Sequence, residues 1–173
     1  MITGSTQQLV LAVYLSSRGF AFVLFEGPLS PYDWGVHAIH GPRKNANCLR
    51  RIERILKFYR PEAIIAQDMT IGGTRRADRI QRLNVVVAEL AEAHGVPLYA
   101  YSRHHMRHIF RTLPVVTKQT IAEAIVKCIP AFERYLPPQR KPWMSEHARM
   151  ALFDAAALGL THFQMQQRGT PES

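Results

Sequence analysis

The fold is decided by residues 9–25, which read LVLAVYLSSRGFAFVLF. Two apolar runs, Leu9–Tyr14 and Phe20–Phe25, flank a short turn made of polar residues and glycine. A continuous apolar run of this length is typical of a strand that is buried on both faces of a sheet. Because the turn is short, we expect the two strands to form an antiparallel hairpin.

The elements expected after the hairpin alternate between helix and strand. They are an edge strand over 32–39, a helix over 45–59, a strand over 63–66, a helix over 76–93, a strand over 96–101, a helix from Lys118 that Pro130 ends or kinks, and a last helix that Ser145 caps and that continues to about Gln166. This order predicts an α/β fold, in which three antiparallel strands and then alternating strands and helices form a mixed sheet with helices on both faces. Residues 1–167 are expected to form a single domain and 168–173 a flexible tail.

The composition is that of a globular and strongly basic protein. Lysine and arginine number 22 among the 173 residues, and the formal net charge is +9. This charge favours DNA, RNA or an anionic membrane surface as a partner, although a basic protein without such a partner can have the same composition. No apolar run reaches the ~18 residues of a membrane span. The polar N-terminus and the two cysteines favour a cytoplasmic location.

Two acidic residues are candidates for a catalytic site. Asp68 follows the strand over 63–66, and Asp154 lies within the small, apolar residues of 151–160. A buried carboxylate costs free energy unless it is paired with a cation, and an ion pair with an arginine is the structural alternative for Asp154. Asp68 could equally be a solvated loop residue. If the two carboxylates converge, they are expected to bind Mg²⁺ or Mn²⁺, as in two-metal nucleases.

Basic residues gather beside these acids. Arg75, Arg76 and Arg79 follow Asp68 closely, and Arg107 lies in the histidine-rich segment 103–111. We expect these side chains to contact the phosphate backbone of a nucleic acid, which supplies affinity without reading sequence. Two histidines of that segment, His104 and His108, have the spacing of zinc ligands on a helix, but no third ligand is evident.

Four short segments resemble the RuvC-type Holliday junction resolvases of the ribonuclease H-like superfamily. They are residues 11–18, 63–68, 117–119 and 154–162, and their order and spacing extend the resemblance over residues 9–163. The resemblance implies a ribonuclease H-like sheet, branched or junction DNA as the partner, a homodimer, and Mg²⁺ or Mn²⁺ as the cofactor of an active enzyme. It also adds Arg18 and Lys118 to the residues expected to contact phosphate.

The resemblance breaks down at two of the four metal-ligand positions of the family. Asp68 and Asp154 match two of them, whereas Tyr14 stands at the first-strand acid and Ala151 at the position three residues before Asp154. A tyrosine phenol is neutral at pH 7 and cannot replace a carboxylate. Conceivable substitutes lie elsewhere, namely Glu26 after the second strand, and Glu146 and His147 on the last helix.

We therefore predict a RuvC-like protein that binds nucleic acid, with branched DNA as its target and with weak or absent metal-dependent nuclease activity. Two alternatives remain open. One is an active Mg²⁺- or Mn²⁺-dependent junction endonuclease with an altered set of ligands, in which Asp68 and Asp154 are the catalytic residues. The other is a protein-interaction module without enzymatic activity on the same fold.

Overall fold

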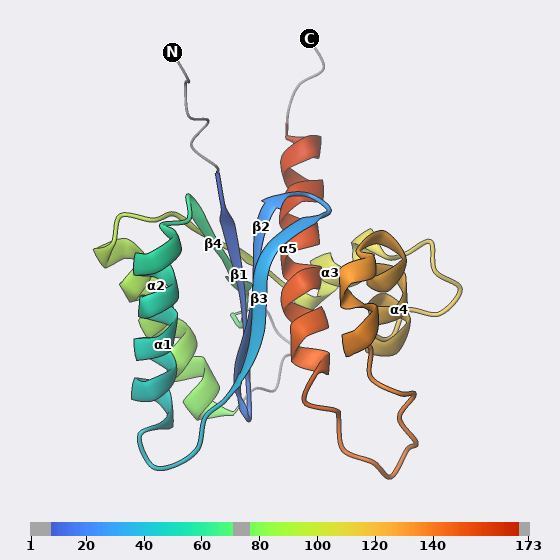
Figure 1. Cartoon of the computed structure of the whole chain (residues 1–173), viewed down its shortest axis with the longest axis horizontal. Helices are drawn as coiled ribbons and strands as arrows, with labels where there is room; N and C mark the ends of the chain where they lie inside the picture. The colour runs from blue at the N-terminus through green and yellow to red at the C-terminus, as the bar shows by residue number, and fades with distance from the viewer. Residues whose placement is uncertain (1–7, 71–76, 170–173) are drawn as a thin grey trace.

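The computed structural model describes residues 8–70 and 77–169, which form a five-stranded mixed sheet with helices on both faces (Figure 1). The strand order is β3-β2-β1-β4-β5. The strands are β1 (Val10–Ser16), β2 (Gly19–Gly27), β3 (Ser30–Ala38), β4 (Ala63–Gln67) and β5 (Leu98–Tyr101). The first three form an antiparallel meander with β3 at the edge, and β4 and β5 run parallel to β1. The mixed sheet predicted from the sequence is confirmed.

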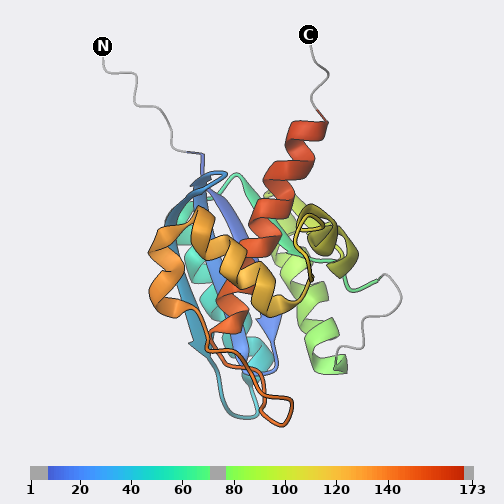
Figure 2. The ribbon, with the colours of Figure 1, turned by 90° about the vertical axis from the view of Figure 1, so that its right-hand side faces the viewer.

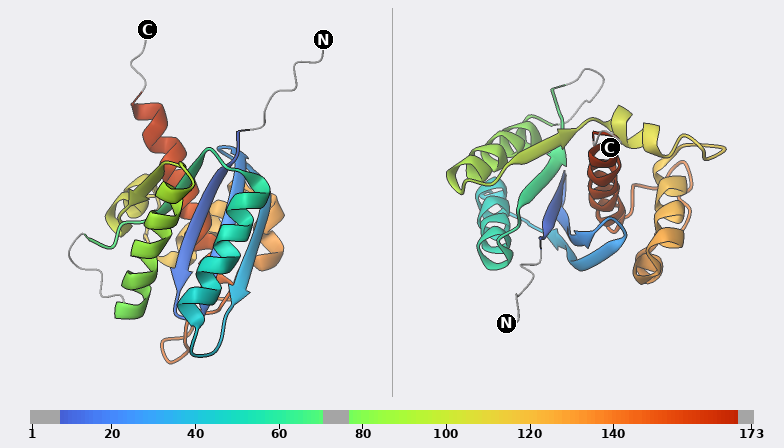
Figure 3. Two further views of the ribbon diagram at one scale, coloured as in Figure 1. Left: turned by 90° about the vertical axis from the view of Figure 1, so that its left-hand side faces the viewer. Right: turned by 90° about the horizontal axis from the view of Figure 1, so that it is seen from above.

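The helices divide between the two faces of this sheet. They are α1 (Lys44–Tyr59), α2 (Asp78–Ala93), α3 (Arg103–Ile109), α4 (Lys118–Cys128), the 3₁₀ helix η1 (Pro130–Tyr135) and α5 (Met150–Arg168). Helices α1 and α2 cover one face, and α5 covers the other with α3, α4 and η1 around it (Figure 3). Figure 2 looks onto the second layer, where α4 lies against α5.

Strand β1 is the centre of the structure because its side chains enter both hydrophobic cores. Leu11 and Val13 pack with α1 and α2, whereas Ala12 and Tyr14 pack with α5. This alternation follows from the period of two along a strand. It fixes Tyr14 as a buried residue under α5, with 5% of its surface exposed.

Helix α5 packs closely on the sheet where its buried face contains small residues. Ala155, Ala156 and Gly159 are buried there. A methyl group added at Gly159 would overlap the ring of Phe25 on β2. This close approach brings the first turns of α5 down to the carboxyl ends of β1 and β4.

The prediction that Ser145 caps the last helix is wrong. Helix α5 begins at Met150, and Arg149 at its N-cap position makes no side-chain capping bond. The preceding residues are held by other contacts instead, since Glu146 pairs with Lys118 and the Arg149 amide donates to His147 Nδ1. Glu146 and His147 therefore precede the helix on which they were expected.

The other boundaries differ less from the prediction. Pro130 ends α4, as expected, and begins η1. Within the histidine-rich segment 103–111, residues Arg103–Ile109 form α3, which begins with a capping box between Ser102 and His105. The predicted tail begins at Arg168, the last residue of α5, and its residues 170–173 lie outside the described part. Within residues 8–70 and 77–169, no helix is both long and apolar enough to cross a membrane.

Candidate nucleic-acid interface

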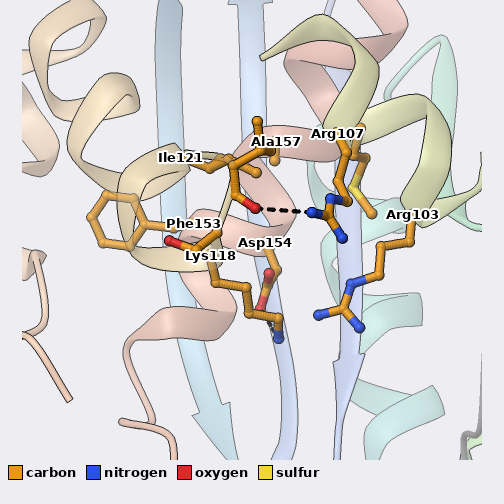
Figure 4. Close-up of a pocket in the computed structure, with 10 residues that line it drawn as sticks. Arg103, Arg107, Lys118, Ile121, Phe153, Asp154 and Ala157 are labelled. Carbon is orange, nitrogen blue, oxygen red and sulfur yellow. Dashed lines mark hydrogen bonds and ion pairs between the residues drawn. The ribbon is translucent and has the colours of Figure 1, made fainter. Parts of the chain in front are cut away.

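The candidate site lies at the edge of the sheet where the parallel strands end. The first turns of α3, α4 and α5 meet there over a small pocket of about 100 Å³, which is lined by Arg103, Arg107, Lys118 and Asp154 among others (Figure 4). Carboxyl ends of strands are where open α/β sheets form their sites, so the position agrees with the fold.

Asp154 is held in this site by an ion pair. Lys118 Nζ lies 3.3 Å from Asp154 Oδ2 and 3.0 Å from Glu146 Oε1. The same ammonium lies 5.6 Å from the centre of the Tyr14 ring, within the range of a cation–π contact. Lys118 thus lies among three groups that attract a cation, one each from β1, α5 and the loop before α5.

The burial of this ion pair changes the acidity of both partners. Burial raises the pKa of Asp154 to about 6, although the Lys118 ammonium works against this shift. Burial alone would lower the pKa of Lys118, but the carboxylates of Asp154 and Glu146 outweigh it and raise that pKa. Both side chains therefore carry their charges at neutral pH, and each is the other's counter-ion.

Asp68 has a different environment from Asp154. It lies one residue beyond the end of β4, where its carboxylate accepts hydrogen bonds from the backbone amide and the hydroxyl of Thr70 at 2.9 and 2.6 Å. These bonds lower the pKa of Asp68. Among the described residues, Asp154 lines the pocket, whereas Asp68 is not one of its lining residues.

The last β4 side chain on the face toward α5 is Gln67. Ala63 and Ile65 belong to the core under α5, and Gln67 follows in the same alternation, next to Tyr14 when the β1–β4 register is continued. Gln67 is 5% exposed, and its Oε1 is a buried acceptor without a hydrogen-bond partner among the described residues. The acceptor at the end of β4 on this face is therefore a neutral amide.

These residues do not fit the divalent metal ion that the resemblance implies. Mg²⁺ and Mn²⁺ favour several oxygen ligands, with carboxylates supplying negative charge. Tyr14, Gln67 and Ala151 supply no carboxylate, and the charge of Asp154 is already balanced by Lys118. In the parts of the chain that the structure describes, no three histidine, cysteine, aspartate or glutamate side chains form a group that could hold a metal ion.

A basic groove continues from the pocket along the outer surface. It has a volume of about 600 Å³ and lies between the first turns of α3 and α4 and the segment 137–147. Its cationic side chains are Arg103, Arg107, Lys118 and Arg140, and its lining carboxylate is Glu146. Such an excess of positive charge in a groove suits a phosphate backbone.

The residues predicted to contact nucleic acid are distributed unevenly around this groove. Lys118 and Arg107 line it, although the Arg107 guanidinium also donates to the Val116 carbonyl at 3.0 Å. Arg18 is exposed in the turn between β1 and β2. Arg79 is bonded to Asn45 Oδ1 at 2.8 Å and to the Ser16 carbonyl at 3.3 Å, so it joins α2 to α1 and to that turn. Arg75 and Arg76 lie outside the described residues.

The sequence interpretation missed two residues of the site, and it included Arg103 only as part of the segment 103–111. The period of two along β4 could have identified Gln67, because it has the same parity as Ala63 and Ile65. Arg140 carries no comparable local signal, since the sequence contains many other arginines and only tertiary packing selects this one.

Comparison with known proteins finds matches to the fold of this chain but none to a protein family or a curated protein. No family model and no curated protein matches the sequence. Thermus thermophilus RuvC matches the structure with a TM-score of 0.68 and 20% identity, over 94% of this chain and 98% of that one. T. thermophilus RuvC in complex with a Holliday junction substrate matches with 0.67 and 19%, over 94% and 97%.

The yeast mitochondrial Holliday junction resolvase Ydc2 matches with a TM-score of 0.62 and 14% identity, over 94% of this chain and 81% of that one. Each of these matches covers 94% of this chain. The protein therefore has the RuvC-type, ribonuclease H-like fold that these Holliday junction resolvases share.

Proposed function

We propose that this protein binds DNA through the basic groove and prefers four-way or otherwise branched DNA to a linear duplex. The groove itself is the observation that supports this proposal. Four cationic side chains from α3, α4 and the segment 137–147 line it together with one carboxylate. Phosphate oxygens are the ligands that such an arrangement attracts, and these contacts position a nucleic acid without reading its bases.

The preference for branched DNA is supported by the shared fold. RuvC from T. thermophilus has been solved in complex with a Holliday junction substrate, and its fold extends over 94% of this chain. Lys118 and Arg107 of the groove, with Arg18 at the same edge of the sheet and Arg75 and Arg76, are the side chains that we assign to phosphate contacts. The cytoplasmic location predicted from the sequence stays a prediction.

We assign weak or absent metal-dependent cleavage to this protein, because Asp154 is paired with Lys118 and Asp68 is bonded to Thr70. The alternative is an enzyme in which Asp68 and Asp154 hold Mg²⁺ or Mn²⁺. Incubation of a labelled four-way junction with Mn²⁺ separates the two, with Asp68→Asn and Asp154→Asn alongside. Symmetric nicking that both variants lose would establish the alternative.

The binding proposal is tested by fluorescence anisotropy with a four-way junction and a linear duplex of equal length. We expect tighter binding to the junction and an affinity that falls steeply as the salt concentration rises. The double variant Arg103→Ala/Arg107→Ala should reduce the slope of log affinity against log salt by about 2, since each lost phosphate contact contributes about 0.9.

A matched control removes the same charge from the other face of the sheet. Arg50→Ala/Arg54→Ala changes two exposed arginines of α1 and should leave the junction affinity closer to that of the wild type. Equal losses in the two double variants would mean that binding follows net charge and not the groove. Equal affinity for junction and duplex would remove the branched-DNA part of the proposal.

A further inference from the structure

The surroundings of the Lys118 ammonium resemble those of a bound metal ion. Its ammonium lies 3.3 Å from a carboxylate of α5 and 3.0 Å from a carboxylate of the preceding loop, and it lies over a ring on the central strand. The two carboxylates come from points eight residues apart in the chain and are brought together by this one cation.

The burial of Asp154 explains why some cation must be present. The Asp154 side chain is only 13% exposed, and a carboxylate removed from water to this extent needs a counter-charge. A divalent ion or a basic side chain can supply that charge. Figure 4 shows the Lys118 side chain extending from the first turn of α4 to the Asp154 carboxylate.

The backbone holds Lys118 in this place. Lys118 is the first residue of α4, and Thr117 before it forms a capping box with Thr120. The Thr117 side chain accepts from the Thr120 amide at 3.1 Å, and Thr120 Oγ1 accepts from the Thr117 amide at 2.9 Å. The cap fixes the start of the helix, so the lysine stem points inward from a defined position.

We infer that the Lys118 ammonium is a built-in cation, which occupies the position that a divalent metal ion would need and leaves Asp154 without affinity for one. This inference rests on the proposed function only because the Lys118 ion pair and the proposed DNA-binding groove lie at the same site. Its test contains no DNA, so failure of DNA binding and failure of this inference give separate results.

The consequence is a gain of metal binding when the ammonium is removed. In Lys118→Met the stem is retained, and the carboxylates of Glu146 and Asp154 lose the cation that separates them. We expect these two carboxylates, each within 3.3 Å of the lost ammonium, to form a weak site for Mn²⁺, which prefers oxygen ligands. In Lys118→Arg a cation remains, so no site should appear.

The experiment is a titration of the purified full chain with Mn²⁺, followed by the electron paramagnetic resonance signal of the unbound ion. We expect no saturable Mn²⁺ site in the wild type or in Lys118→Arg. The control Lys127→Met changes an exposed lysine on the same helix and should also show no site. Lys118→Met should acquire one site, at least about tenfold tighter than any residual binding of the wild type. That site should disappear in Lys118→Met/Asp154→Asn.

Two outcomes would overturn the inference. One is a saturable Mn²⁺ site in the wild type that Asp154→Asn abolishes. The other is a folded Lys118→Met, verified by circular dichroism, that gains no site. If Lys118→Met does not fold, the comparison of the wild type with Asp154→Asn still decides whether Asp154 binds the ion.

Discussion

At Asp154, burial and the ion pair with Lys118 have opposite effects on the pKa of the carboxyl group. Its pKa is raised to about 6, chiefly by burial, while the surrounding charges are Lys118 on α4, Glu146 before α5 and Arg103 on α3. A carboxyl group with a raised pKa in the folded state destabilises the fold once it ionises. The free energy of unfolding should therefore fall as the pH rises from about 4 to about 6, and this contribution should stay constant above that range.

Asp154→Asn should remove this pH dependence. Relative to the wild type, the variant should gain up to about 3 kcal/mol in the free energy of unfolding between about pH 4 and pH 7, since one pKa unit corresponds to 1.36 kcal/mol. Urea denaturation at both pH values measures the difference. Asp68→Asn is the control of opposite sign, because the pKa of Asp68 is lowered and its contribution is lost on acidification. Parallel profiles for Asp154→Asn and the wild type would contradict the prediction.

Part of this site could be predicted from residues alone. The apolar surroundings of Asp154 identified a carboxylate that needs a partner, and an ion pair was the open structural alternative. The partner is a lysine 36 residues earlier, a separation that no local pattern reveals. At the end of β4, Asp68 was predicted as a site residue because it is acidic. The alternation along the strand instead places Gln67 on the face that α5 covers.

At the scale of elements, the contact between α5 and β2 positions Asp154. Gly159 lies against the ring of Phe25, and this ring is fully buried. On an exposed helix, Gly→Ala would raise stability by about 1 kcal/mol. Here the added methyl group overlaps Phe25, and overpacking of this kind costs about 1–3 kcal/mol.

Gly159→Ala should therefore lower the free energy of unfolding, as measured by urea denaturation. Gly169→Ala is the matched control near the end of the same helix, because its added methyl group meets no atom of residues 8–70 or 77–169 closer than 3.7 Å. A stability of Gly159→Ala equal to or above that of the wild type would mean that α5 moves away from the sheet at little cost.

The elements differ in how well the sequence predicted them, for physical reasons. The first two strands have continuous apolar runs, and the positions of the strands and α1 agree with the prediction within about two residues. Ser145 has the chemistry of an N-cap, but the residues after it do not bury a helical face, and Glu146 is drawn to Lys118. The segment before α5 is therefore held by a tertiary ion pair, and Ser145 does not cap the helix.

At the scale of the whole molecule, the remaining prediction concerns assembly. A four-way junction has two equivalent strands for a protein to engage, and the resemblance to RuvC-type resolvases implies a homodimer. We expect light scattering after size-exclusion chromatography to give about twice the chain mass of 19.7 kDa. A mass of one chain, both alone and on the junction, would contradict this prediction.

The layered arrangement around β1 also divides the molecule into parts of unequal local stability. Tyr14 belongs to a strand that is hydrogen-bonded on both sides and covered on both faces, so its amide should exchange with solvent only on global unfolding. Lys118 belongs to α4, an outer helix that packs mainly on α5 and η1. Opening of α4 alone would carry the ammonium away while the sheet and α5 stay folded. In that opened state, Asp154 would lack its counter-ion.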